Sequence, residues 1–229
     1  MLPLRDEIRS RRWPFVTVLL IFINTAVFLY SILSPDVQFN EFVYQYGMIP
    51  AYYSKLLRNG GPIALNDFYP FITSIFLHGG FFHLISNMWV LWLFGDNVED
   101  RMGHFKFLLF YILSGVIAGI IHFLFNPLSP YPTVGASGAI AGVMGAYFIL
   151  YPGARILTLV PSIFIIPIIV HIPAVVYLLF WFLSQLYSGT IQTLAGGGAV
   201  SGVAWWAHVG GFIFGAVCHG YFENKRYWR

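Results

Sequence analysis

The most conspicuous shortage in the sequence is charge. Of 229 residues only 9% are Asp, Glu, Lys or Arg, whereas 58% are hydrophobic; soluble domains average about 25% charged residues. The stretches 107–154 and 156–222 contain no charged residue at all. So little charge cannot solvate a globular surface, which excludes an ordinary soluble enzyme, a disordered chain and a nucleic-acid-binding protein. Charge-free stretches of this length are typical of membrane-spanning segments.

Cysteine is also scarce. Cys218 is the only one, so an internal disulfide is impossible and the cysteine count does not indicate a redox compartment. His78 and His83 lie five residues apart, but no nearby thiolate or carboxylate supplements them as metal ligands. We therefore expect neither a metal site nor a cofactor.

What the sequence does contain is apolar segments that can cross a bilayer, which requires about 20 residues of helix. The predicted fold is an all-α polytopic membrane protein, a single domain over residues 1–229, in which the first span is a retained anchor. The segment 152–170 is apolar but contains two prolines, so it either lies along the membrane surface or extends the fifth helix. The six predicted spans are approximately 14–33, 71–94, 105–125, 133–150, 171–186 and 202–222.

The distribution of Lys and Arg predicts the orientation in the membrane. With six spans, both termini lie on one side, and that side carries Arg5, Arg9, Arg11, Arg12, Arg101, Lys106, Arg155, Lys225, Arg226 and Arg229. The other side carries only Lys55 and Arg58. The positive-inside rule therefore predicts that both termini are cytoplasmic.

Four polar residues inside the spans are candidates for function, because polar side chains in a membrane are costly. Ser137 begins a short fourth helix, and the short length places it roughly 10 Å below the outer surface. His208 lies about 9 Å into the sixth span. His83 and Asn87, four residues apart, share one face of the second span at a similar depth.

Small residues on the fourth and sixth spans predict that these two helices pack closely. They recur at helical spacing beside the candidate residues: Gly135, Gly138, Gly142 and Gly145 on the fourth span and its approach, and Ala207, Gly211 and Gly215 on the sixth. Close packing of these helices would bring Ser137 near His208.

This group of residues could support acyl transfer. Serine is a weak nucleophile that needs an adjacent base, and histidine has a suitable pKa. The charge-free spans hold no acid, so any such site is a Ser137–His208 dyad, with His83 and Asn87 available to stabilise an oxyanion. A proton or substrate pathway is the competing interpretation. Other polar residues in the spans, such as Gln185, are expected to be structural.

Three segments resemble the rhomboid family of intramembrane serine proteases. The segment 78–88, HGGFFHLISNM, resembles the second-helix motif of that family, which continues into Gly95, Glu99 and Gly103. The segment 135–140, GASGAI, is similar to the serine motif, and 207–212, AHVGGF, is similar to the histidine motif. The motifs occur in the order that the family requires.

The resemblance implies a six-helix rhomboid-like bundle in which the loop 34–70 is re-entrant. It also implies that Ser137 is the nucleophile and His208 its general base. His83 and Asn87, with the Ser137 amide, would stabilise the oxyanion.

The resemblance further implies that the loop 188–201 caps the site and that the fifth helix, around Trp181, is the gate for substrates. The expected substrates are transmembrane helices of single-span proteins, cut near the outer surface, and the expected surroundings are lipids of a bacterial inner membrane. No oligomeric state is predicted.

The sequence departs from the family pattern at two positions. Tyr69 and Pro70 replace a Trp-Arg pair that many members carry in the first loop, and Ala141 replaces an aromatic residue that stacks on the base in some members. Glu99 and Arg101 are expected to bond helix ends. The alternatives to a protease are a rhomboid-like pseudoprotease, which binds helices without cutting, and a transporter that uses the buried histidines.

Overall fold

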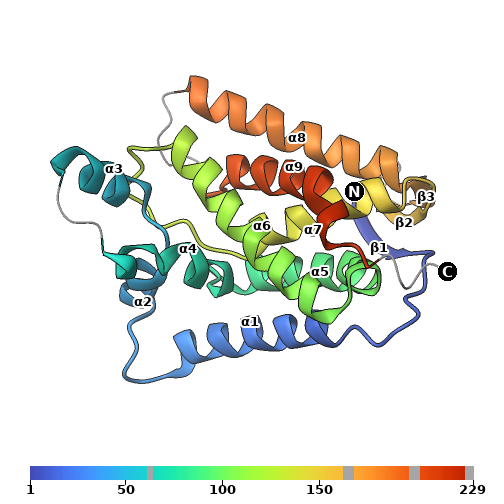
Figure 1. Cartoon of the computed structure of the whole chain (residues 1–229), viewed down its shortest axis with the longest axis horizontal. Coiled ribbons are helices and arrows are strands. Elements are labelled where there is room, and N and C mark those ends of the chain that lie inside the picture. Colours follow the sequence, from blue (N-terminus) through green and yellow to red (C-terminus); the bar gives the residue numbers. More distant parts are fainter. Residues whose placement is uncertain (61–63, 162–167, 196–201, 225–229) are drawn as a thin grey trace.

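The computed structural model describes residues 1–229 except 61–63, 162–167, 196–201 and 225–229. It is mostly helical (Figure 1). A helix lies in each predicted span: α1 Phe15–Leu33, α5 Phe81–Met102, α6 His104–Phe125, α7 Ser137–Leu150, α8 Ala174–Leu194 and α9 Trp205–Phe222. The second of these is displaced from its predicted bounds 71–94, because α5 begins at Phe81 and continues to Met102. Shorter helices lie between α1 and α5: α2 Phe39–Tyr46, α3 Pro50–Asn59, α4 Pro70–Thr73 and the 3-10 turns Leu65–Phe68 and Ser74–Phe76.

Three of the described helices, α1, α6 and α8, are long and apolar enough to cross a membrane, which makes this an integral membrane protein. The residues 65–76 and helix α5 together meet the same criterion but meet at an angle of 82°, because the pair Gly79–Gly80 interrupts the helix. Helix α7 has only 14 residues. That six helices cross the membrane stays a prediction.

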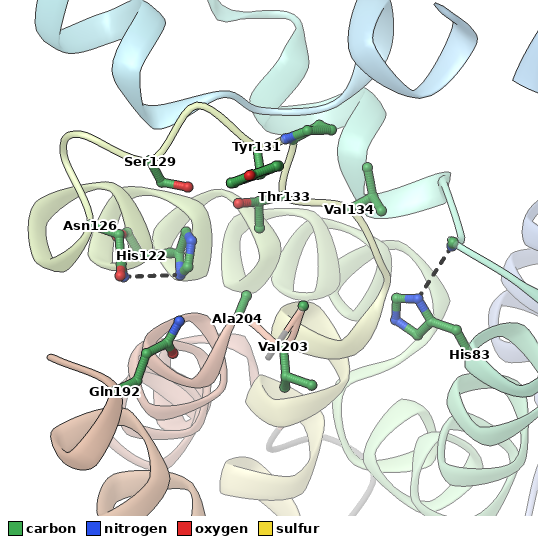
Figure 2. A pocket seen from close by; sticks show the side chains of 13 residues that line it. His83, His122, Asn126, Ser129, Tyr131, Thr133, Val134, Gln192, Val203 and Ala204 are labelled. Carbon is green, nitrogen blue, oxygen red and sulfur yellow. Dashed lines mark hydrogen bonds between the residues drawn. The ribbon is translucent and has the colours of Figure 1, made fainter. Parts of the chain in front are cut away.

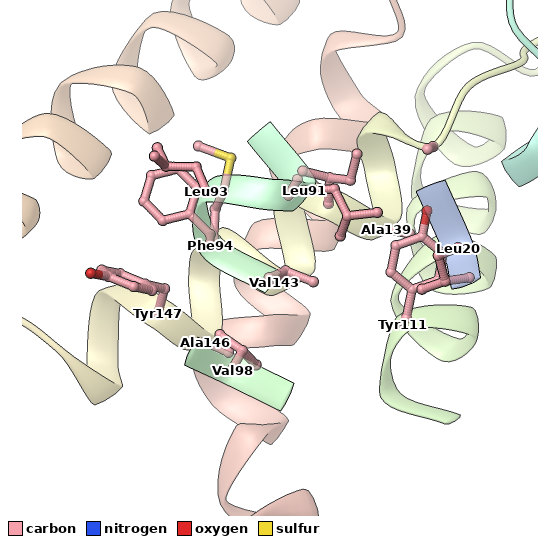
Figure 3. Close-up of a cluster of buried hydrophobic side chains, with 14 of the residues drawn as sticks. Leu20, Leu91, Leu93, Phe94, Val98, Tyr111, Ala139, Val143, Ala146 and Tyr147 are labelled. Atoms are coloured by element: carbon pink, nitrogen blue, oxygen red, sulfur yellow. The ribbon is translucent and has the colours of Figure 1, made fainter. Parts of the chain in front are cut away.

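Helix α7 lies at the centre and packs against α5, α6 and α9 (Figure 1). Every residue from Gly138 to Tyr147 is buried. Figure 3 shows part of this core, where Phe94 of α5 meets Tyr147 of α7 edge-on with ring centroids 4.9 Å apart. A helix that is surrounded by protein buries every side, so α7 is apolar all round and has no separate polar face.

The backbones of α7 and α9 are in direct contact. A Cβ atom on Gly211 would clash with the carbonyl oxygen of Gly138, and one on Gly215 would clash with that of Gly142. Small residues at this spacing let membrane helices approach closely. The contact fixes the position of α9 relative to the first half of α7.

A small sheet joins the amino-terminal residues to the segment between α7 and α8. The strands β1 Leu2–Asp6, β2 Arg155–Val160 and β3 Ile168–Pro173 form an antiparallel sheet in the order β1-β2-β3. The prediction of an entirely helical chain missed this sheet. The described residues of 152–170 pair as strands and do not extend the fifth helix, whereas their position along the membrane surface stays a prediction. Branched residues in IIVHI favour a strand, and proline at either end of the hairpin disfavours a helix.

The sheet also changes the boundaries of the fifth helix. Because β3 includes His171, α8 begins at Ala174, and it continues to Leu194. Residues 188–194 of the predicted capping loop are therefore helical, whereas 196–201 lie outside the described residues.

Glu99 links α5 to α1. Its buried carboxylate accepts hydrogen bonds from the amides of Val16 and Thr17, both at 2.8 Å, and from the Thr17 hydroxyl at 2.7 Å. The first amides of a helix lack intrahelical acceptors, and a negative charge there is favourable. The prediction that Glu99 bonds a helix end is confirmed.

We expect Gly215→Ala to destabilise the protein by about 1–3 kcal/mol, because the added methyl group would force α7 and α9 apart. The measurement is chemical unfolding in detergent micelles. The matched control is Gly220→Ala on the same helix, where an added Cβ meets nothing within 4 Å. That variant should keep or gain stability, since alanine favours helix. Equal stability of the two variants would contradict the backbone contact.

We expect Asp6 to make stability depend on pH. Asp6 accepts hydrogen bonds from the Tyr147 hydroxyl at 2.6 Å and the Asn97 amide at 2.8 Å, and burial raises its pKa from 3.8 to about 6. The folded state therefore binds this proton more tightly than the unfolded state, so the protonated carboxyl stabilises the fold. This contribution is present below pH 4 and is lost as the pH rises through 6.

The test compares the free energy of unfolding of wild type and Asp6→Asn between pH 4 and pH 8. Relative to the variant, wild type should lose stability between about pH 4 and pH 6 and then level off. Asp36→Asn removes an exposed carboxyl and serves as control. A wild-type-minus-variant difference that is flat with pH would contradict the role of Asp6.

Candidate active site

Ser137 is the first residue of α7, and the preceding loop is held in place by the first loop of the chain. The amide of Gly135 donates to the carbonyl of Ser74 at 2.9 Å, and Met48 and Thr133 exchange two backbone hydrogen bonds of 3.1 and 2.7 Å. Gly135 has a φ of 128°, which disfavours any side chain. These contacts fix where α7 begins and therefore where the Ser137 side chain lies.

His208 lies within hydrogen-bond distance of Ser137. The Nε2 atom of His208 is 2.8 Å from the Ser137 Oγ. His208 is in the first turn of α9, and the glycine contacts described above hold this helix against the first half of α7. The sequence predicts that these two side chains lie close together, from their equal depth and the close packing of their helices. The structure places them at this distance.

Three side chains surround the other faces of the His208 ring. The Gln185 Oε1 of α8 lies 2.8 Å from His208 Nδ1. The Trp181 ring, also on α8, is tilted with its centroid 5.9 Å from that of His208, and the Trp205 ring is edge-on at 6.2 Å. Ala141, four residues after Ser137 on α7, is too small to stack on the imidazole. The ring is held instead by Gln185, Trp181 and Trp205.

Gln185 makes the structural bond expected of it, from Nε2 to the Trp181 carbonyl of its own helix, but its contact with His208 is not predicted by the sequence. The available signal was its spacing, since Gln185 follows Trp181 by four residues and so shares a helical face with it. That signal could be read only with the helix direction and the position of α9 known.

His83 approaches Ser137 from the α5 side. Its Nδ1 accepts the Gly79 amide at 3.3 Å, so in the neutral ring Nε2 carries the hydrogen and is a donor. A Cβ on Gly135 would lie 2.7 Å from this Nε2 and 3.6 Å from the Ser137 Oγ. Both atoms therefore face the same small space, which only a glycine leaves open.

Asn87 supplies a buried donor without a partner. It lies one turn after His83 on α5 and is 7% exposed, and its Nδ2 donates to no acceptor in the described part of the chain. An unsatisfied buried donor costs about 1–3 kcal/mol, so its presence calls for an explanation. A negative charge that develops during a reaction would satisfy it.

A hollow of about 150 Å³ opens beside His83 (Figure 2). Its walls come from the loop between α6 and α7, the ends of α6 and α8, and residues 202–204. Figure 2 shows His122 with Asn126 at one end of the hollow and His83 at the other. The space admits several water molecules or one side chain, and uncharged hydrogen-bonding groups dominate its polar lining.

Among the described residues, no three His, Cys, Asp or Glu side chains gather as a metal-binding group. The polar side chains described at the site are a hydroxyl, imidazoles and amides. A hydroxyl paired with an imidazole, beside uncommitted N–H donors, is suited to acyl transfer.

Comparison with known sequences places this arrangement in a family. The Rhomboid domain matches residues 65–224. Rhomboid protease GluP of Bacillus subtilis is 44% identical over 84 residues, which cover 37% of this chain and 16% of that protein. RHOMBOID-like protein 6, mitochondrial, of Arabidopsis thaliana is 40% identical over 81 residues, 35% of this chain and 26% of that protein.

A longer match joins the chain to an organellar relative. Rhomboid-like protein 11, chloroplastic, of Arabidopsis thaliana is 30% identical over 153 residues, 65% of this chain and 50% of that protein. The chain thus spans half or less of the length of these relatives. Because the domain match covers most of the chain and includes the three segments around Ser137, His208 and Asn87, the chain belongs to the rhomboid family.

Proposed function

We propose that the protein is an intramembrane serine endopeptidase with a Ser137–His208 dyad. The observation that carries the proposal is the 2.8 Å contact of Ser137 Oγ with His208 Nε2 at the start of a buried helix. The named protease among its relatives supports it. As a single domain of six spans with a re-entrant first loop, the protein would cut transmembrane helices of single-span proteins near the outer surface of a bacterial inner membrane, with both termini in the cytoplasm.

The proposed reaction begins when the Ser137 hydroxyl attacks the scissile carbonyl and its proton passes to His208 Nε2. The carbonyl oxygen becomes an oxyanion, and the donors at hand are Asn87 Nδ2, His83 Nε2–H and the Ser137 amide. His208 then gives the proton to the leaving amine, which produces an acyl-serine. Water, deprotonated by His208, hydrolyses this ester and restores the serine.

Substrates would enter sideways from the lipid. Helix α8 forms one side of the bundle (Figure 1) and carries Trp181, so it remains the candidate gate. The small space bounded by Gly135, His83 and Ser137 fits a small residue beside the scissile bond.

The presence of both dyad residues at hydrogen-bond distance favours this function over a pseudoprotease. A transporter would gain nothing from that contact, and the spans hold no acidic residues among the candidate groups. Fluorophosphonate labelling separates the alternatives, because only an activated serine reacts.

We expect Ser137→Ala and His208→Ala each to lower cleavage of a single-span substrate in detergent by at least about 10³-fold, since each removes half of the dyad. Mass spectrometry of the products is the measurement. Ser31→Ala removes a hydroxyl from α1, where it bonds the Phe28 carbonyl, and serves as the matched control. Undiminished cleavage by Ser137→Ala, or absence of fluorophosphonate on Ser137 in folded protein, would refute the proposal.

We expect Asn87→Ala to lower kcat about 100-fold with little change in KM, because the amide acts on the transition state. The same substitution should not destabilise the fold, since it deletes an unpaired donor. Asn24→Ala on α1 is the control, because Asn24 Nδ2 bonds the Leu20 carbonyl at 2.7 Å. It should cost about 1 kcal/mol of stability and leave kcat unchanged. If Asn87→Ala lowered stability and left kcat unchanged, while Asn24→Ala lowered kcat, the role of Asn87 would be contradicted.

A further inference from the structure

Gln185 occupies the place next to the base where serine hydrolases with a triad have a carboxylate. It is 7% exposed and projects from α8 toward α9, with Oε1 2.8 Å from His208 Nδ1. The charge-free interior offers no acid for this place. A neutral amide can fill it without the cost of burying an unpaired charge.

The hydrogen bonds around Gln185 determine which end of its amide faces the imidazole. The Ser184 hydroxyl donates to the Trp181 carbonyl at 2.6 Å, so its own oxygen is left as an acceptor. The Gln185 Nε2 donates to that oxygen at 3.0 Å and to the Trp181 carbonyl at 3.3 Å. The nitrogen is therefore committed to its own helix, and the oxygen faces His208.

This orientation fixes the tautomer of His208. An amide oxygen only accepts, so the neighbouring Nδ1 must carry the ring hydrogen. In the neutral ring the opposite nitrogen, Nε2, then presents a lone pair, and this is the atom that lies 2.8 Å from the Ser137 Oγ. In the alternative tautomer, Nε2 would carry the hydrogen and could not accept the serine proton. The lone pair of Nδ1 would then face the lone pairs of the Gln185 oxygen.

We infer that Gln185 is a positioning residue, which holds His208 in the tautomer that can accept the Ser137 proton. It also makes the dyad depend on the position of α8. Gln185 and Trp181 both come from α8, so a displacement of that helix away from α9 removes the hydrogen bond and one ring contact together. The catalytic role of Gln185 rests on the proposed protease function. The His208 tautomer that Gln185 selects does not depend on that function.

The test measures the His208 tautomer directly. The full chain, labelled with ¹⁵N-histidine and reconstituted in lipid bilayers, is studied by solid-state NMR, and the His208 signals are identified by their loss in His208→Ala. Wild type should show a single neutral form protonated at Nδ1. Gln185→Leu should show a mixture of both neutral forms, and Gln185→Glu, which keeps an acceptor oxygen, should restore the Nδ1–H form.

Kinetics supply the second readout. Gln185→Leu should lower kcat about 10- to 100-fold with KM unchanged, since one hydrogen bond that orients the base is lost. Thr190→Val is the matched control on α8, because the exposed Thr190 hydroxyl bonds only the Leu186 carbonyl of its own helix. It should leave both the tautomer and kcat as in wild type.

The outcomes separate the two proposals. A His208 tautomer unchanged in Gln185→Leu, or changed equally in Thr190→Val, overturns the role of Gln185 whatever the activity. A mixed tautomer in Gln185→Leu together with a wild type that never cleaves or labels supports the positioning role and refutes the protease. Thermal unfolding of each variant confirms that the comparison is made on folded protein.

Discussion

The backbone contact between α7 and α9 is the constraint on which the site depends. Neither helix carries a side chain where Gly138 meets Gly211 or where Gly142 meets Gly215, so the two backbones lie at a fixed separation near the start of α7. Ser137 begins one helix and His208 lies one turn into the other, and their 2.8 Å contact follows from that separation. The surrounding helices complete the site: α5 brings His83 beside Gly135 and Ser137, and α8 brings Gln185 to His208.

The polar groups of this space are not all satisfied, and the pattern is informative. Groups that hold geometry are fully bonded: Gln185 is committed at both ends of its amide, and the loop before Ser137 is tied to Ser74 and Met48. By contrast, the Asn87 amide that would act on a reacting group stays unpaired among the described residues. Rigidity is thus provided by one set of bonds, while an unsatisfied donor is retained at some expense of stability.

The helical segments, the small-residue faces and the Ser137–His208 pair could be predicted from the sequence. The length, charge and residue spacing of membrane helices can be recognised along the chain without knowledge of the fold. The sequence did not reveal the sheet, since the pairing of Leu2 with Leu159 joins residues whose proximity no local pattern records. The contact of Gln185 with His208 could not be predicted for a related reason. Its meaning depends on which neighbour it faces, and a lone amide in an apolar helix looks the same whether it bonds its own backbone or a base.

The bond from Glu99 to the first amides of α1 has a consequence for the timing of assembly. The carboxylate that completes the beginning of α1 is 83 residues further along the chain than the amide of Val16 that it binds. Helix α1 is therefore synthesised before the carboxylate that accepts its first amides, and this acceptor exists only once α5 has been made. The strand β1 precedes its partner by a longer stretch of chain, because β2 begins at Arg155. The first turn of α1 and the strand β1 are consequently synthesised before the residues that they bind, so neither set of hydrogen bonds can form until α5, and then β2, has been made.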